Sequence, residues 1–227
     1  MPRGSINVDP RLSALSEMCG ECRVLADIGC DHGRLGAYML QTGRCERVLF
    51  SDISGASLEK ARRLISTLGL SARASFHAGD GAAALPEKPD ACVIAGMGGL
   101  TIAGIVARGA ETLGGARLVL QPNVAVRELR EALAEHGFCI ADERIVRDGH
   151  RLYPVIAAER GRASYDEAQL LVGPVILLRR PAELADYAKY KVRVAKKALF
   201  GMAAGGADDT AMRRELLIWE EVARWSG

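Results

Sequence analysis

The first 160 residues alternate short runs of apolar, β-branched residues with segments whose apolar positions recur at helical spacing. Alternating strands and helices are typical of βαβ units, which build a parallel sheet with helices on both faces. The last two runs lie too close together for a helix between them, so we expect these strands to pair antiparallel. The predicted strands span 23–27, 47–51, 74–78, 90–95, 116–121, 139–146 and 152–158, and the predicted helices lie near 34–42, 55–69, 100–113 and 125–136.

Seven strands that end in an antiparallel hairpin are the order of a Rossmann-like class I methyltransferase sheet. A dinucleotide-dependent dehydrogenase fits less well, because the cofactor half of its sheet is usually parallel throughout. The pattern therefore predicts an α/β fold of the methyltransferase type.

The pattern changes after residue 160, where two apolar stripes at helical spacing follow one another. We expect a helical hairpin attached to the sheet domain. The chain then divides into a sheet domain at 1–160 and a helical extension at 161–227. The stripes consist of Leu184, Tyr187, Tyr190, Val194 and Ala198 in the first helix and of Met212, Leu216, Trp219 and Ala223 in the second.

The formal net charge of +2 is too small to indicate a nucleic-acid partner by itself. Its distribution is more informative, because five Lys and Arg residues and no acid lie between Tyr187 and Gly201. Such a helix face is either an RNA-binding surface or a solvated one, and both interpretations stay open. Four of these residues share a face apart from the apolar stripe, namely Lys189, Arg193, Lys196 and Lys197.

Composition narrows the class of protein further. A chain of 227 residues with 49% hydrophobic content can bury one full core and carry a small appendage. No apolar stretch approaches the roughly 20 residues of a membrane-spanning helix, and residues 1–10 lack an apolar signal core. We therefore expect a cytoplasmic protein without a membrane partner. The six cysteines are scattered, and the single C-x-x-C motif at 19–22 favours small residues at a helix-to-strand junction over a metal site, so no metal is expected.

The stretch "DIGCDHGRLG" at 27–36 places Gly29 and Gly33 between a predicted strand and a predicted helix. The dinucleotide fingerprint G-x-G-x-x-G has a glycine in its second slot, where the backbone approaches a pyrophosphate. Here that slot holds Asp31, whose carboxylate would repel phosphates. S-adenosylmethionine carries no phosphate, its cationic groups are compatible with an acid, and its carboxylate could face the helix that starts near Arg34.

Acids follow the second and third predicted strands. Asp52 lies about 20 residues past the glycine turn, where a carboxylate can accept hydrogen bonds from both ribose hydroxyls. Asp80 is placed to accept from the adenine amino group, and Gly81 keeps the backbone close to the base. Each acid could instead only cap the helix that follows it.

The fourth and fifth predicted strands end where a substrate meets the cofactor in a doubly wound sheet. The glycines of "AGMGG" at 95–99 admit a flat group, and Met97 could lie against a ring or within the core. In "LQPN", Gln121 and Asn123 can hydrogen-bond a base edge, and Pro122 stiffens the turn. Taken alone, these two amides would more often be ordinary loop residues.

Four stretches in this order and spacing carry a resemblance to a known family: "ADIGCDHGRLGAYML", "SDIS", "IAGMGG" and "LVLQPN". Followed by "LREALAEHGFCIADERIVRDGHRLYPVI" and a helical extension, they resemble the bacterial tRNA adenine-N1 methyltransferases that modify adenosine 22 in the D-arm. The resemblance covers nearly the whole chain. It implies a class I fold with S-adenosylmethionine as cofactor, tRNA as partner and a coiled-coil-like helical domain that helps to hold the tRNA.

The resemblance also implies residue roles, motif by motif. Its cofactor side contains Asp27, Gly29, Asp31, His32, Asp52 and Asp80. Its target side contains Met97, Gly98, Gln121, Pro122 and Asn123. The candidate cofactor-binding residues are Asp27, Gly29, Cys30, Gly33, Asp52, Ile53, Asp80, Gly81, Ala95 and Gly96. The candidate catalytic residues are Asp31, His32, Met97, Gln121 and Asn123, and the candidate RNA-binding residues are Lys189, Arg193, Lys196 and Lys197.

The chemistry of adenine N1 limits what the residues must do. N1 has its own lone pair, so methyl transfer needs alignment and exclusion of water rather than proton removal. A carboxylate that accepts from N6 would stabilise the cation that forms, and Asp31, with His32 orienting it, is the candidate for this role. Alternatively, Asp31 binds the methionine amine and His32 braces the turn.

Two rival functions share some of these features. An NAD-dependent oxidoreductase would share Asp52 but needs a turn that tolerates pyrophosphate. A non-catalytic tRNA-binding protein would keep the basic helix, yet the intact Asp27, Asp52 and Asp80 argue against it. A monomer is one oligomeric state that the sequence leaves open.

Overall fold

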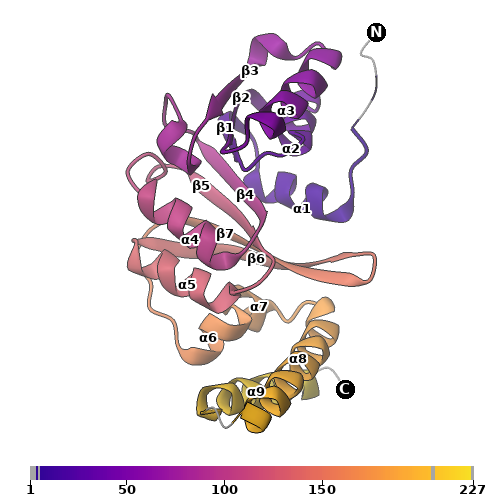
Figure 1. Ribbon diagram of the computed structural model, residues 1–227, viewed down its shortest axis with the longest axis vertical. Coiled ribbons are helices and arrows are strands. Elements are labelled where there is room, and N and C mark those ends of the chain that lie inside the picture. The colour runs from indigo at the N-terminus through magenta and orange to yellow at the C-terminus, as the bar shows by residue number, and fades with distance from the viewer. Residues whose placement is uncertain (1–3, 5, 206–207, 226–227) are drawn as a thin grey trace.

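The computed structural model describes residues 4, 6–205 and 208–225 and contains a seven-stranded sheet of order β3-β2-β1-β4-β5-β7-β6 (Figure 1). Neighbouring strands are parallel except for β7, which is antiparallel to both β5 and β6. The predicted methyltransferase-type sheet is thus confirmed. The strands are β1 (Cys22–Ile28), β2 (Cys45–Asp52), β3 (Ala74–Ala78), β4 (Ala91–Met97), β5 (Arg117–Pro122), β6 (Phe138–Asp148) and β7 (Arg151–Arg160).

The predicted helices are all present, and the described residues contain further ones that periodicity did not reveal, namely α1, α6 and α7. Two short 3-10 helices lie at Ser71–Arg73 and Gly81–Ala84. The α-helices are α1 (Pro10–Cys19), α2 (Arg34–Gln41), α3 (Gly55–Thr67), α4 (Gly99–Arg108), α5 (Val126–Glu135), α6 (Glu167–Val172), α7 (Pro174–Arg179), α8 (Glu183–Gly205) and α9 (Thr210–Arg224).

Helices cover both faces of the sheet, as βαβ connections require. On one face of the sheet, α1, α2 and α3 pack against the strands through buried residues such as Leu12 and Met39. On the other face α4 and α5 pack through residues such as Ile102 and Leu129. Of the helices in the described residues, none is long and apolar enough to cross a membrane.

The C-terminal helices form a third apolar cluster below the sheet in Figure 1. Trp219 of α9 is buried against Tyr187 of α8, their ring centroids 5.6 Å apart. The prediction of the apolar stripe on α8 is wrong in its central part, because Tyr190 and Val194 are exposed. The helix buries Ala188 and Ala195 in their place, so the packed face is rotated toward α9.

The β6–β7 hairpin projects beyond the rest of the sheet, above α8 in Figure 1. β5 pairs with β7 only from Leu118 to Leu120, so the first residues of β7 and the last of β6 extend past the end of β5. The hairpin contacts the helical extension through an ion pair between Arg147 and Asp186 of α8.

Candidate cofactor and substrate site

The sheet reverses its strand order between β1 and β4, which is the position where open α/β sheets bind ligands beyond the carboxyl ends of the strands. A cavity of about 450 Å³ lies at this position. Eight predicted site residues line it, contributed by the ends of β1 and β4: Asp27, Gly29, Cys30, Asp31, His32, Ala95, Gly96 and Met97.

Asp27 lies at the end of β1 as a buried carboxylate of this cavity. Its Oδ2 accepts a hydrogen bond from the backbone N–H of Gly36, 3.2 Å away, which ties the strand to the start of α2. Burial, together with the nearby charge of Asp52, raises the pKa of Asp27 to about 7, although the Gly36 bond lowers it. A cationic group in the cavity would relieve this burial cost.

Gly29 and Met97 meet across the crevice. The φ of Gly29 is +68°, which favours glycine at this position, and a Cβ built there would lie 1.9 Å from Cε of Met97, the movable end of that side chain. Gly33 does not line the cavity. It adopts φ +66° and packs so closely on α3 that an added Cβ would approach Ala61 to 2.8 Å.

Asp52 holds the glycine turn in place. Its Oδ2 accepts from the backbone N–H of Asp31 at 3.2 Å, and its Oδ1 accepts from the N–H of Ser54 at 2.8 Å. Ser54 supplies the side-chain cap of α3. The alternative in which Asp52 serves only as a helix cap is therefore not what the structure shows.

Asp31 and His32 lie on the exposed rim of the cavity. The side chain of Asp31 is 65% exposed and lies 3.6 Å from Nζ of Lys60 and 3.5 Å from Nε2 of His32. Its φ of +44° is a left-handed conformation that Asp tolerates better than most residues. The turn therefore leaves this carboxylate accessible from outside the protein.

The predicted adenine-side residues lie outside the cavity lining. Asp80 is exposed and forms an ion pair with Arg108 of α4 at 2.9 Å, without capping the 3-10 helix that follows. Gly81 is buried, and an added Cβ would lie 2.7 Å from Ile105. Ile53 is 83% exposed, which leaves an apolar surface beside Asp52 open to a ligand.

A chain of side-chain amides connects the ends of β4 and β5. Gln121 is fully buried; its Oε1 accepts from Arg11 at 3.2 Å, and its Nε2 donates to Oδ1 of Asn123 at 3.0 Å. Asn123 in turn donates from Nδ2 to the carbonyl of Gly96 at 2.7 Å. Both ends of the Gln121 amide are thus in use, and only Asn123 of the two is exposed.

The start of α1 forms a cavity wall that the sequence interpretation missed. Arg11 lines the cavity, and its guanidinium also lies over the ring of Tyr153, 5.4 Å from the centroid. A signal for this helix exists, because Asp9 followed by Pro10 is a typical helix start and Asp9 does cap α1. The wall residues without a sequence prediction are Asp9, Arg11, Leu12, Leu15, Arg34, Leu35 and Val93.

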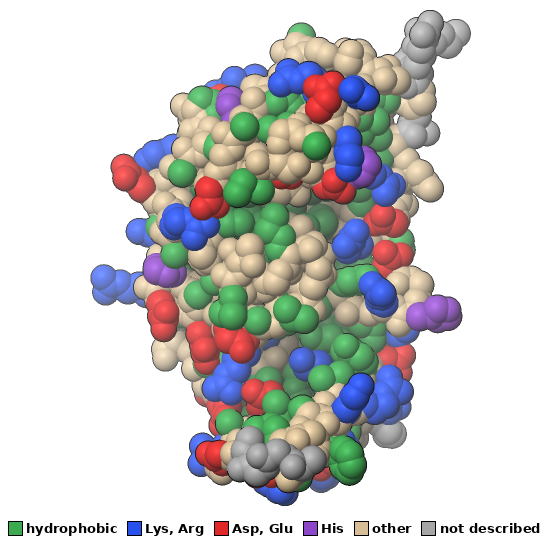
Figure 2. Space-filling model, in the orientation of Figure 1, with side chains coloured by type: hydrophobic (Ala, Val, Ile, Leu, Met, Phe, Trp, Pro, Cys, Tyr) green, Lys and Arg blue, Asp and Glu red, His purple; other side chains and the backbone are tan. Residues whose placement is uncertain are grey.

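The predicted basic face lies on the exposed side of α8. Lys189, Arg193 and Lys197 are exposed, whereas Nζ of Lys196 lies 2.8 Å from Oε1 of Glu220 on α9, which offsets its charge. Figure 2 shows Lys and Arg side chains over these C-terminal helices at the lower end of the molecule.

The cysteines are free thiols. Cys19 and Cys22 lie at the junction of α1 and β1, and burial raises the pKa of Cys22 to about 11. Across residues 6–205 and 208–225, no group of three or more His, Cys, Asp or Glu side chains could hold a metal ion.

Comparison with known proteins decides between the candidate classes. The sequence model of a family described as tRNA (adenine(22)-N(1))-methyltransferase matches residues 25–217. The chain belongs to this family. A curated relative from Bacillus subtilis strain 168, a tRNA (adenine(22)-N(1))-methyltransferase, is 33% identical over 185 residues, which are 78% of each chain. The family predicted from the sequence motifs is confirmed, and the rival oxidoreductase is not favoured.

Solved structures of family members have the same fold. The B. subtilis m1A22 tRNA methyltransferase is 27% identical with a TM-score of 0.83, covering 96% of this chain and 100% of that one. A putative tRNA (m1A22) methyltransferase from Streptococcus pneumoniae, in complex with S-adenosyl-L-methionine, is 23% identical with a TM-score of 0.86 over 96% and 100% of the two chains.

Proposed function

We propose that this protein transfers the methyl group of S-adenosylmethionine to N1 of adenine 22 in tRNA. The single observation that carries the proposal is the coincidence of the family match with a cavity at the point where strand order reverses. We propose further that residues 1–160 bind the cofactor, that residues 161–227 hold the tRNA, and that the reaction takes place in the cytoplasm.

The residues around the cavity fit the groups of S-adenosylmethionine, which supplies a methyl group on a sulfonium centre. Asp52 would accept hydrogen bonds from the ribose hydroxyls, with the exposed Ile53 against the adenine. Asp27 would bind the ammonium group of the cofactor, because its buried carboxylate bonds no cationic side chain among the described residues. Arg11 would bind the carboxylate, since its guanidinium lines the same cavity.

The rim residues would receive the target base. Asp31 lies on the exposed rim, whereas Asp27 is buried, so we assign Asp31 to N6 of the target adenine, with His32 beside it. Exposed apolar side chains flank the same edge, because Leu100 is 66% and Val124 is 65% exposed. Such surfaces can pack against a base that has been freed from pairing and stacking.

The rate of methyl transfer would depend mainly on the alignment of N1, the methyl carbon and the sulfur, because N1 attacks through its own lone pair. Met97 bridges the crevice above Gly29, and an unbranched thioether can shift to rest on a ring. Asn123 donates to the carbonyl of Gly96, and the rest of its exposed side-chain amide would hydrogen-bond the base. Gln121 acts on Asn123 from below as a positioning residue.

Transfer of labelled methyl groups tests this function. The protein is incubated with methyl-labelled S-adenosylmethionine and either unmodified tRNA or the same tRNA with guanine at position 22. We expect label in the first tRNA and none in the second. Equal labelling of both transcripts, or of neither, would overturn the proposal, and NAD titrated by calorimetry tests the oxidoreductase alternative in the same preparation.

A further inference from the structure

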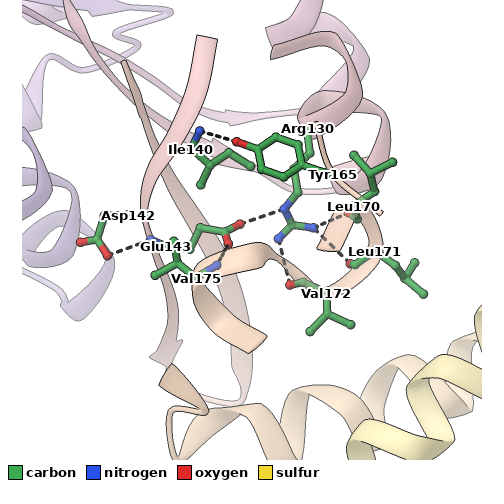
Figure 3. Close-up of polar contacts among 9 residues, drawn as sticks. All are labelled: Arg130, Ile140, Asp142, Glu143, Tyr165, Leu170, Leu171, Val172 and Val175. Atoms are coloured by element: carbon green, nitrogen blue, oxygen red, sulfur yellow. Dashed lines mark hydrogen bonds and ion pairs between the residues drawn. The ribbon is translucent and has the colours of Figure 1, made fainter. Parts of the chain in front are cut away.

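Arg130 and Glu143 form a buried ion pair where the sheet meets the helical extension (Figure 3). Nε of Arg130 on α5 lies 2.8 Å from Oε1 of Glu143 on β6, and the two side chains are 1% and 0% exposed. Removing both charges from water is costly unless further hydrogen bonds satisfy them. The structure supplies these bonds from the start of the extension.

Arg130 binds the last turn of α6. Its Nη1 donates to the carbonyls of Leu170 at 2.8 Å and Leu171 at 3.1 Å, and its Nη2 donates to that of Val172 at 3.0 Å. Carbonyls at a helix end lack partners within the helix and carry partial negative charge. The guanidinium therefore caps α6 from the catalytic domain.

Glu143 binds the first turn of α7. Its Oε2 accepts from the backbone N–H of Val175 at 3.0 Å. Between the two helices, Gly173 has φ +120°, and an added Cβ would lie 2.5 Å from Oε2 of Glu143 and 2.8 Å from Nη2 of Arg130. The ion pair thus bonds both helices on either side of one tight junction, which we call the α6–α7 junction, residues 172–175.

Helix α5 links this junction to the catalytic edge. It begins at Val126, with two residues between it and the Gln121–Asn123 segment, and an added Cβ on Gly99 would lie 2.0 Å from the carbonyl oxygen of Ala125. One turn before Arg130, Nη1 of Arg127 lies 3.5 Å from Oε1 of Glu215 on α9. A single helix therefore contacts the site at its start and the extension along its side.

We propose that Arg130 and Glu143 are positioning residues for the tRNA, which fix the direction of the extension relative to the methyl-transfer site. This inference rests on the proposed function. An apolar pair could fill the same space, whereas two opposite charges that each bond a different helix specify one arrangement of the junction. Neither residue contacts the substrate; they act through α6 and α7 on the basic face of α8.

The double variant Arg130→Met with Glu143→Leu tests the proposal, because it removes both charges together and so leaves no unpaired buried charge, while it removes the bonds to α6 and α7. The methyl-transfer site and the basic face of α8 can bind one tRNA together only when the distance and angle between them are right. KM for tRNA should therefore rise about tenfold or more in this variant. The affinity for S-adenosylmethionine and kcat at saturating tRNA should stay near the unmutated values. The matched control, Arg63→Met with Glu59→Leu, removes an exposed pair on α3 and should leave KM unchanged.

A second variant covers the case in which the double variant does not fold. Arg130→Lys keeps a cation beside Glu143 but cannot reach three carbonyls at once, so KM for tRNA should rise while thermal unfolding shows an intact protein. An unchanged KM in either folded variant would overturn the proposal, as would a parallel loss of cofactor affinity. Failure of the unmutated protein to methylate tRNA would instead remove the proposed function, before any variant is compared.

Discussion

Arg11 donates a hydrogen bond from Nη1 to Oε1 of Gln121, joining the first helix to the end of β5 across 110 positions of the chain. Gln121 passes this contact to Asn123, whose amide holds the carbonyl of Gly96. The bond therefore connects the cavity at the end of β1 with the loop that follows β5. Because both ends of the Gln121 amide are bonded within the protein, we propose that Gln121 supports Asn123 and does not contact the base.

Replacing Arg11 should weaken the cofactor complex. Arg11→Met would remove the charge-assisted hydrogen bond that we propose to the carboxylate of S-adenosylmethionine, worth about 1.5–3 kcal/mol, and isothermal titration calorimetry measures the loss. Arg23→Met, at the opposite end of β1, is the control and should bind normally. If Arg11→Met keeps full affinity but loses turnover, Arg11 acts only on Gln121.

Cofactor affinity should depend on pH through Asp27. The raised pKa of this carboxyl, about 7, means that at lower pH the ammonium of the cofactor must displace a proton. Affinity should therefore rise as pH increases toward about 7, by up to about tenfold per unit, and level off above it. Calorimetry across this range measures the curve. Asp27→Asn should bind weakly at every pH, and a pH dependence that survives in this variant would assign it to another group.

Turnover should depend on Asp31 more than cofactor binding does. Asp31→Asn keeps the backbone bond to Asp52 but removes the charge that we propose stabilises the methylated base, so kcat should fall about 10²- to 10³-fold. Single-turnover kinetics and calorimetry separate the two effects. Lys60→Met removes the ion-pair partner alone and should stay active. Loss of affinity with full turnover at saturating cofactor would place Asp31 at the methionine end instead.

Binding of tRNA should depend on salt through the exposed face of α8. Each phosphate that a variant no longer neutralises should lower the slope of log affinity against log salt by about 0.7–0.9. We expect a shallower slope for the triple variant Lys189→Gln, Arg193→Gln, Lys197→Gln, because Lys196 is already paired with Glu220. Filter binding over a range of salt concentrations measures it, with Lys88→Gln and Arg62→Gln as the control. An unaltered slope would mean that this face is only solvated.

The sheet was predictable because its strands are short, apolar and regularly separated by helical segments, which local pattern detects well. Helices α6 and α7 were not, since six residues are too few for a helical period to stand out. The stripe on α8 was misplaced because Lys191 occupies a packed position, its ammonium 5.6 Å from the centre of the Trp219 ring. A long charged side chain can bury its stem and so disguise an inward face.

The grouping of the candidate site residues was predictable where they follow strand ends, since parallel strands bring Gly29, Asp52 and Met97 to one edge. Arg11 was not, because its contact with Gln121 depends on how α1 docks on the sheet. The pairing of Asp80 with Arg108 has the same origin, since no local pattern shows which side of the turn an arginine 28 positions away will reach.

Mass spectrometry of tRNA fragments tests the central claim most directly. After incubation with S-adenosylmethionine, the fragment containing position 22 should gain one methyl group, and its nucleosides should include N1-methyladenosine. Asp52→Ala should reduce this product strongly. The control is Asp90→Ala, which removes a carboxylate that accepts from two backbone N–H groups at the other end of the strands, and it should leave the product unchanged. Methylation at another position, or at N6 in place of N1, would contradict the account.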